Sequence, residues 1–167
     1  IEWVKSVGAK TINLLSKGSE KHCVGQLKKT PQEHFDSICE EVERAVAAGL
    51  NVNLYLEDWS NGMKNSYKYV YDLMDAVRHL PIKRFMLPDT LGILNPYDTL
   101  AHIQRMIKRY PELHFDFHAH NDYDLATSNV YAAVLGGARG VHCTVNGLGE
   151  RAGNACLSSI VAVIHDQ

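Results

Sequence analysis

Strand-like and helix-like segments alternate along the whole chain, and this alternation restricts the possible folds more than any other feature. Strands are expected at residues 10–15, 52–56, 84–88, 113–117 and 140–145. An apolar helical pattern follows each of them, and no linker, low-complexity tract or run of charge interrupts the series. Five such units predict one parallel sheet with right-handed crossover connections.

Several helix ends are marked by capping residues. Residues 30–33, with the sequence Thr-Pro-Gln-Glu, combine an N-cap, a proline at the first helical position and the glutamate of a capping box. Gly49 is expected to end this helix. Asn95, which is followed by a proline, is expected to cap another helix. These signals place the helices between the strands.

Polar, glycine-containing loops, such as those expected at residues 16–29 and 57–62, follow the strands, whereas the links from each helix to the next strand are short and plain. This asymmetry is typical of folds that carry their function at the carboxyl ends of the strands. A doubly wound sheet also fits the alternation, but its glycine-rich phosphate loop is absent, since Lys17-Gly-Ser is no such motif. We therefore predict an α/β fold, with five of the eight units of a TIM (β/α)8 barrel.

The two ends of the sequence indicate a partial domain. Residues 1–8 have the pattern of the last turns of a helix, without an initiator methionine, and residues 157–165 form an apolar helix with no following cap. We expect residues 1–167 to be one partial catalytic barrel domain whose N-terminal units are missing. Because an open piece of a barrel exposes two strand edges, we expect it to be unstable or to self-associate alone.

Composition excludes several classes of partner. The formal charge of -2 and the absence of a basic block argue against nucleic-acid binding. Four scattered cysteines without a C-x-x-C pair favour a reducing cytosol over disulfides or a zinc cluster. No apolar run has the length of a membrane span and no signal peptide is visible. We expect a cytoplasmic protein without a membrane partner.

Two motifs near the end of the chain carry the clearest chemical signal. His118 and His120 stand two residues apart at a strand end, so that both side chains would project from the same face and could bind one divalent metal ion. Two solvated histidines are the alternative interpretation. Residues 147–154, Gly-Leu-Gly-Glu-Arg-Ala-Gly-Asn, add an amide, a carboxylate and an arginine. Together the motifs predict a metal site at the sheet's carboxyl edge.

These motifs resemble those of the DRE-TIM metallolyases. His-x-His-Asn-Asp followed by the glycine-rich residues 146–154 is similar to the acetyl-CoA-condensing branch, which contains the isopropylmalate, homocitrate and citramalate synthases of amino-acid biosynthesis. The resemblance covers essentially the whole chain, as barrel units four to eight. It implies an acyltransferase acting on acetyl-CoA and a 2-oxo acid, and a homodimer for the full-length protein.

The resemblance also implies a catalytic divalent metal ion bound by His118, His120 and Asn154. Such a set of nitrogen and oxygen ligands with open positions suits Zn, Mn or Mg with a chelating 2-oxo acid. An ordinary loop or capping role is the alternative for Asn154. In the family a further aspartate comes from the first barrel strand. Nothing in this chain supplies it, so we expect the 167-residue chain alone to be inactive.

Glu57 and Thr90 are the next candidates. Glu57 ends an apolar strand, where burial tends to bring a carboxyl group into a useful acid-base range, and it matches the family's active-site glutamate. A loop charge beside Asp58 is its alternative. Thr90 resembles the family threonine that hydrogen-bonds the carboxylate of the 2-oxo acid. A turn-forming Asp-Thr pair is the alternative for Thr90.

Tyr55 stands two residues before Glu57 and therefore faces the same side of the strand. The segment 55–62 is most similar to citramalate synthases, whose tyrosine walls the pyruvate pocket. The resemblance thus implies pyruvate as substrate and citramalate as product, with 2-isopropylmalate or homocitrate synthesis as alternatives. Packing in the core is the alternative role for Tyr55.

Two other functions stay open at this point. A lyase that cleaves a hydroxyacyl thioester, like the hydroxymethylglutaryl-CoA lyases, would share the barrel and the metal. Those relatives carry a cysteine in the glycine loop, and residues 147–154 contain none. The other function is a non-catalytic half-barrel. No chemical step is assigned to Glu150, Arg151, His22 or Cys23, and the adjacent pair 142–143 is discarded as a ligand pair because neighbouring strand residues face opposite ways.

Overall fold

The computed structural model describes residues 1–167, and its strands form one five-stranded sheet. The strands are β1 (Thr11–Lys17), β2 (Asn51–Glu57), β3 (Ile82–Asp89), β4 (Phe115–Ala119) and β5 (Gly140–His142). They lie in the order β1-β2-β3-β4-β5, and β1 pairs with β2, and β4 with β5, in parallel. A doubly wound sheet would reverse direction at a switch point, whereas a barrel adds strands in sequence. The prediction of a barrel-type α/β fold is confirmed.

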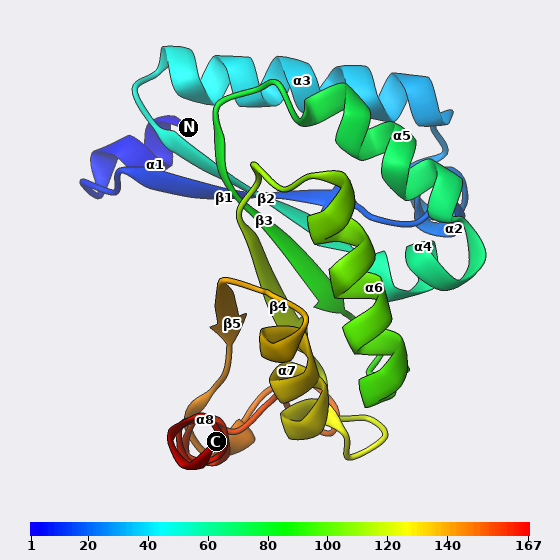
Figure 1. Ribbon diagram of the computed structural model, residues 1–167. Helices are drawn as coiled ribbons and strands as arrows, with labels where there is room; N and C mark the ends of the chain where they lie inside the picture. Colours follow the sequence, from blue (N-terminus) through cyan, green and yellow to red (C-terminus); the bar gives the residue numbers. More distant parts are fainter. The chain divides into compact units, whose positions relative to one another are not determined.

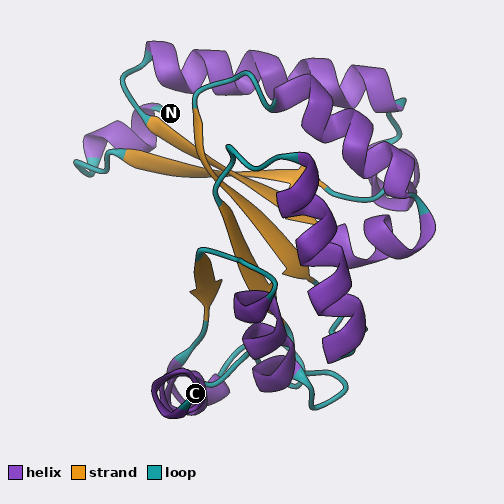
Figure 2. Cartoon of the chain, in the orientation of Figure 1, coloured by secondary structure: helices purple, strands orange, loops and turns teal.

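Helices fill the intervals between the strands (Figures 1 and 2). They are α1 (Glu2–Ser6), α2 (Glu20–His22), α3 (Pro31–Ala47), α4 (Trp59–Asn65), α5 (Tyr67–Val77), α6 (Pro96–Arg109), α7 (Ala126–Leu135) and α8 (Leu157–Asp166). A π-helical turn (Cys23–Leu27) follows α2, and a 3₁₀ turn (Val145–Gly147) follows β5. No helix has the length and apolar character needed to cross a lipid bilayer. Two compact units, residues 1–85 and 86–167, are described in turn.

In the first unit, side chains alternate between the two faces of the β1–β2 pair. Val52, Leu54 and Leu56 are fully buried, and α3 packs against both strands. Figure 1 shows α3 beside α5, which it contacts. This face therefore carries the apolar core of the unit.

The opposite face of the same pair carries mostly polar residues in matched pairs. The register places Asn13 beside Asn53, whose amide nitrogen donates a hydrogen bond to the Asn13 amide oxygen over 2.9 Å. Two residues further along, Tyr55 lies beside an exposed leucine, and the last pair is Lys17 and Glu57. The polar side chains thus end in an ion pair at the carboxyl edge of both strands.

The predicted helix caps are present. The Thr30 hydroxyl accepts from the Glu33 amide over 3.3 Å, and the Glu33 carboxylate accepts from the Thr30 amide over 2.8 Å. These hydrogen bonds hold the pKa of Glu33 below its usual value. At the start of α6, the side-chain oxygen of Asn95 accepts from the amide of Asp98 over 2.9 Å. The prediction of a capping box at residues 30–33 is confirmed.

Two segments expected to be loops are partly helical. Residues 16–29 contain the end of β1, α2 and the π-helical turn, and residues 57–62 run into α4. The Ser19 hydroxyl donates to the Asp58 carboxylate over 2.6 Å, and Asn61 donates to its other oxygen over 2.7 Å. One bond from a distant segment and one from the next helix thus hold Asp58, whose φ is 67°. Local sequence patterns do not reveal such contacts.

In the second unit, α7 packs against β4 and against α6. Phe115, Phe117 and Ala119 are buried on the face that these helices cover. Strand β5 ends at His142, three residues earlier than predicted, because the chain enters a 3₁₀ turn in which Asn146 has a φ of 57°. The remaining face of β4 carries the histidines.

Gly62 gives a test of how the first unit is assembled. A methyl group at this position would collide with the backbone oxygen of Gly18 and with a methyl of Val70. Gly62→Ala should therefore lower the free energy of unfolding by about 2–3 kcal/mol, as overpacking does. Gly25→Ala is the matched control, because a Cβ at Gly25 meets nothing within 4 Å. Equal urea midpoints for the two variants would contradict the packing described here.

Candidate active site

The polar face of β4 presents a row of titratable side chains spaced two residues apart: His114, Asp116, His118 and His120. The rings of His118 and His120 lie side by side, with their centroids 4.9 Å apart and their planes at 86°. His120 follows the last strand residue, and its Nδ1 atom is buried without a hydrogen-bond partner. The alternation of strand side chains thus produces an imidazole pair at the carboxyl end of β4.

The surroundings keep both rings neutral near pH 7. Burial, together with the neighbouring His120 and His142, lowers the pKa of His118 to about 4. Burial, followed by the Arg151 cation, lowers the pKa of His120. A neutral imidazole offers a ring nitrogen lone pair to a metal ion, whereas an imidazolium does not.

The glycine-rich segment brings Asn154 to the same place. Asn154 forms an isolated antiparallel bridge with His120, and its side-chain oxygen is buried without a hydrogen-bond partner. A Cβ at Gly149 would collide with the Asn154 amide, so glycine is needed there for the amide to fit. The structure therefore brings all three predicted metal-binding residues together.

The donor set fits a divalent cation in part. It offers two imidazoles and one amide oxygen, and two of its polar atoms, on His120 and Asn154, are buried without hydrogen bonds. Such buried atoms are costly unless a partner satisfies them, and a bound cation would do so. No group of three or more His, Cys, Asp or Glu side chains in the chain is placed to hold a metal ion. His118, His120 and Asn154 are the candidate set because they lie together and two of their polar atoms lack partners.

Arg151 ties three loops of the second unit together. Its guanidinium donates to both oxygens of Asp122, over 2.7 and 2.8 Å, and to the backbone oxygen of Thr90 over 2.8 Å. The two-pronged bond lowers the pKa of Asp122. Arg151 thereby fixes the glycine loop, which carries Asn154, against the loops that follow β4 and β3.

Thr90 lies in a tight turn at the end of β3. The fully buried Asp89 carboxylate accepts hydrogen bonds from the amides of Ile93 and Leu94, over 3.1 and 3.0 Å. The turn-forming role therefore belongs to Asp89. The amide of His120 also donates to the backbone oxygen of Asp89 over 3.3 Å, so this turn is attached to the histidine segment.

Tyr55 and Glu57 lie in the first unit, on the polar face of β2. The Glu57 carboxylate forms an ion pair with Lys17, with 2.5 Å between Nζ and Oε2. The backbone oxygen of Tyr55 accepts from the Ser16 hydroxyl over 2.8 Å, and burial raises the pKa of the tyrosine hydroxyl. Both side chains are only partly buried, on the face opposite the apolar core.

Three residues to which the sequence assigned no role lie beside these candidates. His142 is the register partner of His118, with ring centroids 5.7 Å apart, and its Nε2 lies 3.5 Å from a carboxylate oxygen of Asp116. The sequence argument weighed His142 only with its chain neighbour, not with a residue on the next strand. Lys17 is paired with Glu57 by strand register, for which their positions at the two strand ends are a signal. His22, which was assigned no chemical step, lies 3.8 Å from the Glu57 carboxylate.

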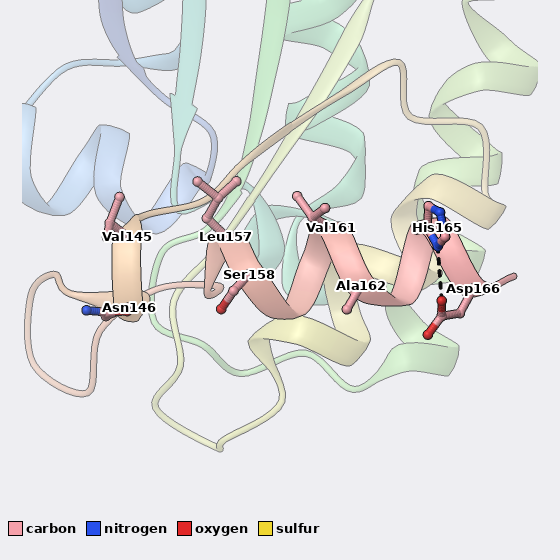
Figure 3. A pocket seen from close by; sticks show the side chains of 8 residues that line it. All are labelled: Val145, Asn146, Leu157, Ser158, Val161, Ala162, His165 and Asp166. Atoms are coloured by element: carbon pink, nitrogen blue, oxygen red, sulfur yellow. Dashed lines mark hydrogen bonds and ion pairs between the residues drawn. The ribbon is translucent and has the colours of Figure 1, made fainter.

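A second surface of this unit is an apolar groove of about 570 Å³ along α8 (Figure 3). Val145, Leu157 and Val161 project toward one side of the helix, and the His165 ring shares a hydrogen bond with Asp166. None of the predicted metal-binding or substrate-binding residues lines the groove. The groove is therefore separate from the candidate residues at the strand ends.

Comparison with known families identifies the family of the chain. The HMGL-like family model matches residues 1–167, which is the entire chain. The chain belongs to the HMGL-like family. Its DRE-TIM metallolyase resemblance is thereby confirmed.

Among curated HMGL-like relatives, a homocitrate synthase of Sulfolobus acidocaldarius is 36% identical over 146 residues, covering 87% of this chain and 31% of the relative. A putative (R)-citramalate synthase of Methanopyrus kandleri is 35% identical over 159 residues, covering 95% of this chain and 31% of the relative. The chain thus spans about a third of the length of these relatives.

Solved structures support the same fold. The HMG-CoA lyase of Bacillus subtilis superposes with a TM-score of 0.85 at 22% sequence identity, covering 99% of this HMGL-like chain and 58% of the lyase. At this level of identity the likeness concerns the fold alone.

The low pKa of His118 predicts how stability depends on pH. The pKa of His118 in the folded protein, about 4, lies below its pKa in the unfolded chain. The stability linked to the neutral ring is therefore fully present above the unfolded pKa and is lost as pH falls toward 4. From about pH 7 to pH 5, the unfolding free energy of the metal-free protein should fall by about 2 kcal/mol from this residue. His118→Gln should flatten the dependence measured by urea unfolding. If the unfolding free energies of both proteins changed with pH at the same slope, the neutral state of the His118 ring in the folded protein would be contradicted.

Proposed function

We propose that this chain is part of a metal-dependent acyltransferase that condenses acetyl-CoA with a 2-oxo acid and then hydrolyses the thioester. The observation that carries the proposal is the neutral pair of half-buried His118 and buried His120 beside Asn154, in a chain about as similar to a homocitrate synthase as to a putative citramalate synthase. Because the chain spans 31% of each relative, we further propose that residues 1–167 are part of one catalytic barrel. Activity is therefore to be measured on the full-length polypeptide that contains it, which we expect to be a homodimer.

The proposed metal-binding residues are His118, His120 and Asn154, with Zn, Mn or Mg as the cation. A bound divalent cation supplies Lewis-acid stabilisation of negative charge on the ketone oxygen of a 2-oxo acid. The protein's part is to keep both imidazoles neutral by burial and to hold the Asn154 loop through Arg151. Arg151 is thus a structural support of the site.

Three residues are proposed to act on the organic substrates. Glu57 serves as the acid-base group, with its carboxylate at the carboxyl end of β2. The Thr90 hydroxyl binds the carboxylate of the 2-oxo acid, and the turn built by Asp89 places it at the end of β3. The ring of Tyr55 walls the pocket for the acid's side chain, which favours pyruvate and makes citramalate the product.

A lyase acting on a hydroxyacyl thioester is the second candidate, because HMG-CoA lyases have the same fold. The synthase is preferred because the curated relatives at 35–36% identity have synthase names, and because residues 147–154 contain no cysteine. Thiol release from acetyl-CoA that depends on a 2-oxo acid and stops with a chelator is the expected result. Cleavage of hydroxymethylglutaryl-CoA without such release would favour the lyase.

His118→Ala in the full-length protein tests the metal site. Loss of this ligand should lower bound divalent metal to background and reduce turnover on the order of a hundredfold or more. Metal content after dialysis and the rate of thiol release are the two measurements. His165→Ala, which removes an exposed histidine of the same unit, should change neither. Full metal content in the His118→Ala protein would show that the assignment is wrong.

Tyr55→Ala tests substrate choice. Removing the ring should admit branched acids and narrow the preference for pyruvate over 2-oxoisovalerate by about tenfold or more, since a misfit of one methyl group costs roughly 1–3 kcal/mol. The comparison needs kcat/KM for both acids in both proteins. Tyr97→Ala, at an exposed position, is the control. An unchanged ratio would assign Tyr55 to packing and favour isopropylmalate synthesis.

A further inference from the structure

Glu57 does not stand alone at the end of β2. Lys17 is its register partner on β1, and both residues are the last of their strands. The Lys17 ammonium contacts Oε2 of Glu57 at 2.5 Å, and the two side chains are only 14% and 23% exposed. An ion pair with this little access to water is screened far less than an ordinary surface pair.

The backbone amide and carbonyl groups of Lys17 both form hydrogen bonds with side chains. Its amide donates to Nε2 of His34 over 3.1 Å, and its carbonyl oxygen accepts from the Tyr69 hydroxyl over 3.0 Å. The next amide, of Gly18, donates to the backbone oxygen of Glu57 over 2.6 Å. These three bonds fix the strand end from which the ammonium reaches Glu57, so little freedom is left to the pair.

The other oxygen of Glu57 faces a different group. Nδ1 of His22 lies 3.8 Å from Oε1, beyond hydrogen-bond distance, while its Nε2 lies 3.4 Å from the buried Asp58 carboxylate. Ser19 donates to that same Asp58 oxygen and caps the short helix that carries His22. The two carboxylate oxygens are therefore unequal: Oε2 is bound to a cation, and Oε1 has no direct bond to His22.

We propose that Lys17 is the positioning residue of Glu57: it binds Oε2 and so presents Oε1 as the oxygen that exchanges protons with the substrate. This inference rests on the proposed function, because it assumes that Glu57 is the acid-base group. Lys17 acts only through Glu57 and touches no substrate. It also balances the charge of a carboxylate that is mostly shielded from water.

The test is a double-mutant cycle in the full-length protein, with kcat and KM for pyruvate as readouts. Lys17→Met should lower kcat about a hundredfold, the scale of a misplaced catalytic group, while KM changes less than about threefold. Lys17→Arg, which keeps a cation, should recover at least about tenfold of this loss. In a Glu57→Gln background, Lys17→Met should add less than about threefold, because the group it positions is already gone.

Lys68→Met is the matched control, since it removes an ion pair of the same 2.5 Å length whose side chains are 82% and 47% exposed. It should leave kcat unchanged. Lys17→Gln, which retains a donor, replaces the methionine variant if that protein does not fold by circular dichroism.

Three outcomes are distinguishable. A wild-type kcat in Lys17→Met, or an equal loss in the Glu57→Gln background, would overturn the positioning role. Absence of thiol release by the unmutated protein with every 2-oxo acid would instead overturn the proposed function, and with it the role of Glu57 on which this inference depends. The proposal would be supported if Lys17→Met lowers kcat only in the protein that retains Glu57, and if Lys17→Arg restores part of that kcat.

Discussion

Side chains on neighbouring strands alternate between two faces, and the site depends on this constraint. On β2 and β4 one face is apolar and buried under helices, which supplies the free energy that holds the sheet. The other face is thereby left for polar side chains. At the carboxyl ends of the strands it presents Lys17 with Glu57 in the first unit and the His118–His120 pair in the second. The same two-residue periodicity thus places the apolar core on one face of the sheet and the candidate site residues on the other.

Burying polar side chains on this face costs free energy, and hydrogen bonds and ion pairs in the loops offset this cost. Asp58, Asp89 and Asp116 are fully or almost fully buried, and each has hydrogen-bond or ion-pair partners. Asp58 joins the end of β1 to the end of β2, and Asp89 builds the turn after β3. Buried carboxylates of this kind are stable only with their partners in place, so they fix the loops that carry candidate residues. The Arg151–Asp122 bond does the same for the glycine loop at lower burial.

The sequence predicted the parts of the structure that depend on local rules. The strand alternation, the capping box at residues 30–33 and the neighbouring positions of His118 and His120 follow from periodicity and capping chemistry. The helices inside residues 16–29 and 57–62 could not be predicted, because they are held by the Ser19–Asp58 bond between segments far apart in the chain. His142 and Lys17 were missed because their partners are set by strand register, which no local pattern gives. The roles of Glu57, Thr90, Tyr55 and the metal-binding residues stay predictions.

We propose above all that His118, His120 and Asn154 bind one divalent cation. Crystals of the full-length protein grown with Mn or Zn, with diffraction recorded at the absorption edge of the metal, test it most directly. We expect one anomalous peak with a ring nitrogen of each histidine and the Asn154 side-chain oxygen at about 2.0–2.2 Å, the usual bond lengths for such ligands. A metal peak elsewhere, with no density beside these three side chains, would contradict the account.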